Sequence, residues 1–254
     1  MFAGYGLGRG RTRRIAKKSR LEESFVNLKP SLAALALTLT VSLSAQADNR
    51  EEFSKANQML FLTPHMDALD EAGTTIHYRY ERSGTHQEPE NVFSDRISLT
   101  VTDVLDGSFR AGEVQFLTGE RQRPFPGFRQ ARGNPVLAGF LQHDVNRMSE
   151  ATGGPVRFFQ NRIKIVLEDE PVIEEISFEY EGEEVSGHRI TVTPYRDDSD
   201  RNRYDREFWD KYYTFTVSEG VPGFIYQLEA VAPKSDADEP YYKDVLTLES
   251  VERP

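Results

Sequence analysis

Alternation of apolar and polar residues dominates the chain after residue 70 and predicts strands. In residues 74–82, Ile76, Tyr78 and Tyr80 alternate with polar or charged side chains, which is the period of a strand with one buried face. The same period recurs in seven further segments: 93–103, 109–117, 173–181, 185–193, 208–217, 224–232 and 241–251. Turn signals separate several of them, so the pattern favours antiparallel hairpins.

One segment, residues 134–154, has the period of a helix instead. Asn134 and Pro135 form a start signal, and Gly153 and Gly154 supply a left-handed stop. Between them lies one apolar stripe, made of Leu137, Phe140, Leu141, Val145 and Met148. We expect this helix to lay its stripe on the sheet that the strands form.

Two other segments carry weaker helical patterns. Residues 50–62 are polar at first and apolar at the end, which is compatible with a short helix before Pro64. Residues 155–168 are ambiguous, because the apolar positions fit a helix whereas residues 163–166 also fit a strand, and we expect a helix that passes into a strand. The whole pattern predicts an α+β fold, with a strongly curved antiparallel β-sheet covered on one face by helices.

The first 47 residues have the layout of a signal peptide. A basic region precedes the short apolar run 32–43, and Ala45-Gln46-Ala47 is a small-residue cleavage signal. The run is shorter than a bilayer requires, and the alternative is an uncleaved anchor. We therefore predict a signal peptide over 1–47, cleavage near Ala47, and a single exported, periplasmic domain over 48–254 that is not integral to the membrane.

Charge and composition narrow the classes of partner. The chain has a net charge of −10, and residues 1–47 hold eight Lys/Arg and two Asp/Glu, so residues 48–254 carry −16. This charge argues against nucleic acid as a partner. The chain contains no cysteine, which excludes disulfides and zinc–thiolate sites.

No catalytic motif is visible in the sequence, so we expect a protein that is not an enzyme, with no metal and no cofactor. The most suggestive pair is His143-Asp144 on the predicted helix. Neighbouring helical residues point about 100° apart, so these two do not form a joint site. We expect His143 to border the apolar stripe and Asp144 to face water.

An arginine-rich segment, residues 121–132, is unusual in so acidic a chain. It interleaves aromatic residues with four cations, Arg121, Arg123, Arg129 and Arg132. Such a segment suits an anionic group or the carboxylates of a partner protein. The alternative is that it pairs with acidic loops of its own chain.

The order of these elements in an exported, acidic chain resembles the periplasmic lipoprotein-carrier (LolA-like) superfamily. That resemblance implies a site for acyl chains between the sheet and its helices, lined here by Tyr78, Leu137, Phe140, Leu141, Phe178 and Phe215. It implies a non-enzymatic periplasmic carrier for an apolar or lipidated ligand, with a lipid or lipidated protein as partner. The alternative is an envelope protein–protein interaction or assembly factor that uses the basic loop 121–132.

Overall fold

The computed structural model describes residues 53–85, 92–169, 171–234 and 238–254. The predicted signal segment 1–47 lies outside these residues, so it stays a prediction. Within the described ranges, no helix combines the length and the apolar character that crossing a membrane would require.

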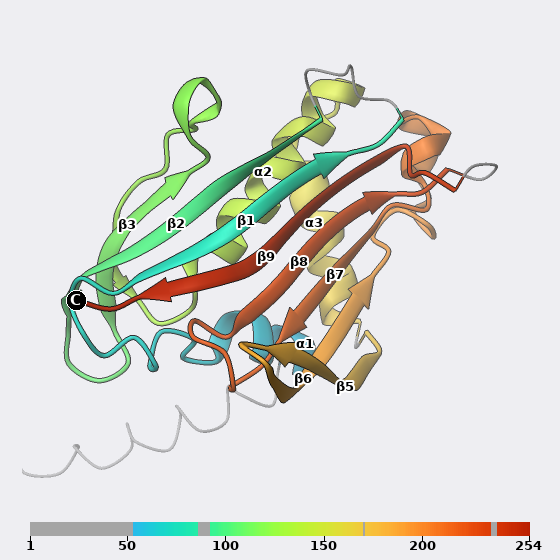
Figure 1. Cartoon of the computed structure of the whole chain (residues 1–254). Coiled ribbons are helices and arrows are strands. Elements are labelled where there is room, and N and C mark those ends of the chain that lie inside the picture. Colours follow the sequence, from blue (N-terminus) through green and yellow to red (C-terminus); the bar gives the residue numbers. More distant parts are fainter. Residues whose placement is uncertain (1–52, 86–91, 170, 235–237) are drawn as a thin grey trace, which may run out of the picture. The chain divides into compact units, whose positions relative to one another are not determined.

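The described strands form one nine-stranded antiparallel sheet in the order β4-β3-β2-β1-β9-β8-β7-β6-β5 (Figure 1). The strands are β1 (Thr75–Ser83), β2 (Phe93–Val104), β3 (Arg110–Phe116), β4 (Phe128–Ala131), β5 (Ile173–Tyr180), β6 (Glu183–Val192), β7 (Tyr212–Val217), β8 (Ile225–Ala232) and β9 (Tyr242–Glu252). The first and last of them, β1 and β9, pair in the middle of the sheet. The sheet is open, with edges at β4 and β5, and its strong curvature stays a prediction.

The eight predicted strands are confirmed, with ends shifted by a few residues. The alternation in β1 works as expected, because Ile76, Tyr78 and Tyr80 are all buried. The additional strand, β4, lies in the arginine-rich segment 121–132, where the sequence predicted no strand. It is only four residues long and covers the edge beside β3.

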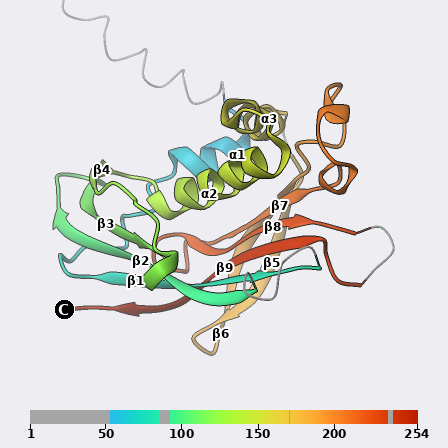
Figure 2. The same cartoon turned by 90° about the horizontal axis from the view of Figure 1, so that it is seen from above.

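Three helices lie on one side of the sheet (Figure 2). They are α1 (Lys55–Asn57), which continues into the π-helical turn η2 (Gln58–Leu62), α2 (Pro135–Thr152) and α3 (Val156–Glu168). Three short 3-10 turns complete the elements: η4 (Gly119–Arg121), η5 (Arg201–Arg203) and η6 (Arg206–Phe208). The fold class is therefore α+β, as predicted.

Helix α2 begins and ends where its local signals indicate. The side-chain oxygen of Asn134 accepts a hydrogen bond from the backbone N–H of Val136 at 3.0 Å, which caps the first turn. Gly153 has a φ of 71°, a left-handed conformation that glycine adopts without a Cβ penalty. The predicted boundaries of the helix in residues 134–154 are therefore confirmed.

Helix α3 occupies the segment 155–168, for which the sequence pattern was ambiguous. Residues 156–168 are helical throughout, so the expected passage into a strand was wrong. Phe159, Ile163 and Leu167, spaced four residues apart, are its buried face. This spacing outweighs the β-branched residues at positions 163, 165 and 166, because α3 packs beside α2 and above the sheet rather than within it.

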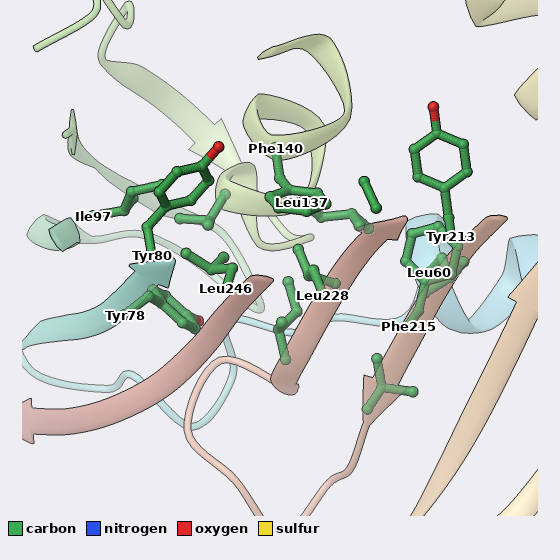
Figure 3. Close-up of a cluster of buried hydrophobic side chains, with 14 of the residues drawn as sticks. Leu60, Tyr78, Tyr80, Ile97, Leu137, Phe140, Tyr213, Phe215, Leu228 and Leu246 are labelled. Carbon is green, nitrogen blue, oxygen red and sulfur yellow. The ribbon is translucent and has the colours of Figure 1, made fainter. Parts of the chain in front are cut away.

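The core lies between α2 and the middle of the sheet. Tyr78, Phe140, Phe215 and Leu246 are at most 1% exposed, and side chains of α2 meet those of β1, β2, β7, β8 and β9 there (Figure 3). Full burial of one such side chain contributes roughly 1.5–3 kcal/mol. Core side chains therefore occupy the layer where the family resemblance implied a site for acyl chains, and that site stays a prediction.

Candidate functional site

An apolar hollow, here called the helical groove, opens between the three helices. It encloses about 440 Å³ and lies between α1 with η2 on one side and α2 with α3 on the other. Its apolar wall includes Phe53, Phe61, Leu62, Leu141, Ile163 and Leu167. Its volume falls in the range of about 300–1,000 Å³ that small-molecule pockets commonly have.

Large apolar side chains are exposed at the mouth of the helical groove. Phe53, Phe61 and Leu62 are 43%, 44% and 43% exposed. At the rim, the side-chain amide of Gln160 on α3 donates to the side-chain oxygen of Gln142 on α2 at 2.6 Å. The groove therefore has an apolar wall and a polar rim, which is the usual composition of a site for an amphiphile.

A second hollow, here called the arginine cleft, opens on the other flank of α2. It encloses about 670 Å³ between α2 and residues 123–126, which connect β3 to β4. Three cations line it, Arg82, Arg123 and Arg147, together with His143 and one carboxylate, Glu150. Ala138 and Gln142 line both hollows, so only the exposed ridge of α2 separates the arginine cleft from the helical groove.

The wall of the arginine cleft depends on one glycine. A Cβ at Gly139 would lie 2.5 Å from the ring of Phe125. The glycine therefore lets Phe125 approach α2, where its ring is parallel to that of Phe116 with centroids 6.2 Å apart. These two rings form the apolar side of a cleft whose lining also includes Arg82, Arg123, Arg147 and Glu150.

Beneath the cleft lies a buried ionic network centred on Asp244 of β9. Arg82 faces Asp244 directly across the β1–β9 pair, and its Nε donates to the carboxylate at 2.9 Å. Arg147 of α2 donates to the same carboxylate at 2.8 Å, the Tyr80 hydroxyl also donates to it, and the Tyr242 hydroxyl oxygen lies 3.1 Å from it. Arg82 additionally contacts His143 Nε2 at 2.9 Å.

A second buried carboxylate, Asp144 of α2, continues this network. Lys211, just before β7, donates to both of its oxygens at 2.7 Å, and Tyr213 and Tyr242 donate to it as well. Tyr242 therefore connects the two carboxylates. Asp144 is 1% exposed, so the expectation that it faces water was wrong, because a cation far away in sequence supplies its partner.

Burial and pairing decide the charge of each group. Burial alone would raise the pKa of Asp144, but the Lys211 ammonium and the hydrogen bonds to the carboxylate lower it below its usual value. Burial would likewise raise the pKa of Asp244, but Arg82 and Arg147 lower it below its usual value. Burial lowers the pKa of His143 to about 4, so this imidazole is neutral at pH 7.

The residues predicted to contact an apolar ligand lie in different parts of the structure. Tyr78, Leu137, Phe140 and Phe215 are at most 2% exposed and belong to the core. Phe178 is partly buried and stacks on Tyr226, with ring centroids 4.1 Å apart. Of the six, Leu141 lines the helical groove. Their role as ligand contacts stays a prediction, and for the four core residues it would require α2 to move off the sheet.

The four predicted anion-binding or partner-binding arginines do not share one neighbourhood. The Arg121 guanidinium lies 4.4 Å from the ring centroid of Phe93, and that of Arg132 lies 5.7 Å from that of Phe109. Arg123 lines the arginine cleft, and Arg129 is exposed on β4. Their binding role, and the interaction-factor alternative, stay predictions.

Sequence reasoning missed Arg82, Arg147, Lys211 and Asp244. For Asp244 a signal was present, since it shares the period of Tyr242, Leu246 and Leu248 on the inward face of the last strand. Arg82 likewise continues the inward series of β1 after Tyr80. A charge at an inward strand position indicates a buried ion pair or a site, since a lone buried charge is costly.

Comparison with known proteins leaves the family open. No family model and no curated protein sequence matches the chain. Among solved structures, lipoprotein LppX of Mycobacterium tuberculosis is similar at 10% identity, with 79% of this chain and 98% of LppX covered and a TM-score of 0.35. This is a weak fold resemblance, and no functional argument is based on it.

Proposed function

We propose that the chain is a non-enzymatic periplasmic carrier for an apolar or lipidated ligand, and that the helical groove holds the ligand's apolar chain. The observation that supports this is the exposed apolar mouth of the groove, formed by Phe53, Phe61 and Leu62. Each methylene that leaves water in such a groove contributes about 0.8 kcal/mol, so an acyl chain gains several kcal/mol.

The location of the groove refines the proposal that the sequence suggested. Core side chains and buried ion pairs occupy the layer beneath the middle of α2, whereas the helical groove lies among the three helices. A ligand entering the groove would leave the core intact. It would need only small movements of exposed side chains such as Phe61.

A pair of matched variants tests the proposal. Phe61→Gln places a polar group in the wall of the groove, and Ile165→Gln changes an α3 side chain that is similarly exposed, at 52%, and is not part of that wall. Native mass spectrometry of the protein purified from its host, with titration of an apolar fluorophore, gives the readout. We expect co-purifying lipid or fluorophore binding in the wild type and in Ile165→Gln, with binding weakened in Phe61→Gln.

Two outcomes would refute the carrier role in this form. One is a wild-type protein that carries no lipid and binds no fluorophore. The other is an equal loss of binding in both variants, which would show that the fluorophore senses exposed apolar surface in general.

A further inference from the structure

A surplus of positive charge lies beneath the arginine cleft. The buried network joins three cations, Arg82, Arg147 and Lys211, with only two carboxylates, Asp144 and Asp244. His143, which contacts Arg82, adds no charge at neutral pH. Among the described residues of this network, one positive charge is therefore left without a carboxylate.

That surplus is presented to the cleft rather than sealed in the core. The side chains of Arg82 and Arg147 are 11% and 22% exposed, and both line the cleft, whereas Lys211 is completely buried. Asp244 accepts a hydrogen bond from Nη1 of Arg147 and pairs with Arg82 on the neighbouring strand, so it holds both guanidinium groups in place. Two cations are thus positioned in advance, and their side-chain entropy is already lost before any ligand binds.

Arg123, an exposed residue in the connection between β3 and β4, also lines the cleft and adds a third positive charge to the lining. Its backbone N–H donates to the carbonyl of Phe116 at 2.9 Å, which fixes the chain at that point. The opposing carboxylate in the lining is Glu150, which is exposed, so the lining carries three positive charges and one negative charge. The rings of Phe116 and Phe125 exclude water from one side and strengthen the field inside.

We infer that the arginine cleft binds an oxyanion, the carboxylate or phosphate group of a small molecule or of a lipid. The planar guanidinium fork matches both groups and binds them through paired, charge-assisted hydrogen bonds. This site is independent of the helical groove. Because the two hollows meet at Ala138 and Gln142, an anionic amphiphile is the one ligand that would fill both.

The full chain can be titrated with inorganic phosphate and followed by NMR of the arginine Nε–H signals. We expect saturable shifts for the wild type and affinity about tenfold weaker for Arg123→Gln, since a charge-assisted hydrogen bond is lost. The matched control is Arg121→Gln, an exposed arginine two positions away that packs on Phe93 and is not part of the cleft lining. It should bind as the wild type does. Glu150→Gln should bind more tightly, because it removes the opposing charge.

A second titration separates the two possible sources of the oxyanion. An alkyl phosphate that binds no better than inorganic phosphate would indicate a free anion, and tighter binding that Phe61→Gln abolishes would indicate an amphiphile. Both results support the oxyanion site. The inference is overturned if phosphate does not saturate the wild type, or if Arg121→Gln and Arg123→Gln lose affinity equally. Failure of phosphate binding with intact fluorophore binding would remove this site and leave the carrier proposal standing.

Discussion

The ammonium nitrogen of Lys211 lies 2.7 Å from both carboxylate oxygens of Asp144, and the two side chains are 0% and 1% exposed. This pair connects α2 to the residue that precedes β7, through the same layer that the apolar core fills. A buried pair gains little net stability over apolar residues, but breaking it leaves one charge in the core. The pair therefore fixes where α2 sits on the sheet, and it opposes any opening between the two.

Replacing one partner of the Lys211–Asp144 pair by a neutral residue should destabilise the fold. We expect Lys211→Met and Asp144→Asn each to lower the free energy of unfolding by about 3–5 kcal/mol, since each leaves a buried charge uncompensated. The double variant should cost clearly less than the sum of the two, because neither charge then remains. Urea unfolding followed by circular dichroism measures all three.

The surface pair Arg196–Asp210 is the control, with side chains 54% and 60% exposed and an N–O distance of 3.0 Å. Asp210→Asn should change stability by no more than about 0.5 kcal/mol. Additive costs in the double variant would show that Lys211 and Asp144 are not coupled as the structure has them.

His143 should make stability depend on pH in a defined window. Its pKa in the folded protein is about 4, against an ordinary value of 6.5, because burial and the nearby cations Arg82 and Arg147 outweigh Asp244 and Asp144. As the pH falls from 6.5 to about 4, the unfolded chain takes up a proton that the folded chain refuses, so stability is lost on acidification. The loss from this group is at most about 3 kcal/mol.

His143→Gln should flatten the pH profile in that window, because glutamine does not titrate. The lowered pKa values of Asp144 and Asp244 act in the same direction at lower pH, below their ordinary value of 3.8. Denaturant unfolding at several pH values separates the two windows. An unchanged slope between pH 6.5 and 4 in His143→Gln would contradict the assignment.

Asn134 should contribute more to the free energy of unfolding than an ordinary helix cap does. Besides capping α2, its side-chain amide donates to the hydroxyl of Tyr78 at 2.8 Å and to the carbonyl of Gly223 at 2.9 Å. Asn134→Ala loses the cap, about 0.5–2 kcal/mol, and leaves buried partners unsatisfied, so we expect a total loss of about 2–4 kcal/mol.

Asn146→Ala is the comparison for this variant. Asn146 lies on the same helix, is exposed, and accepts one hydrogen bond from Gln142 at 2.7 Å. Thermal or urea unfolding should show a loss of no more than about 0.5 kcal/mol. Similar losses in the two variants would mean that the three contacts of Asn134 contribute little.

What the sequence predicted well was local in origin. The ends of α2 follow from Asn134, Pro135 and Gly153, each of which acts within its own turn. The eight longer strands follow from a period of two that holds over most of each segment. Strand β4 was not predicted, because four residues are too few to show a period and its strand conformation depends on pairing with β3.

What the sequence did not predict depends on long-range partners. Helical periodicity put Asp144 on the wet face, whereas Lys211, 67 positions later, turns that position into part of the core. The location of a hollow is not predictable from the sequence for a related reason. Whether a layer is filled or empty depends on side chains such as Leu137, Phe215 and Leu246 meeting from separate elements, and periodicity in one segment does not report that.

Photocrosslinking with an alkyl diazirine, followed by peptide mapping, tests most directly whether the helical groove holds the apolar chain. We predict that the label appears on residues 53–62, 138–145 and 160–168, and that Phe61→Gln reduces it while Ile165→Gln does not. Label on Tyr78 or Phe215 would instead place the ligand between α2 and the sheet. That result, or the absence of specific label, would contradict the proposed groove.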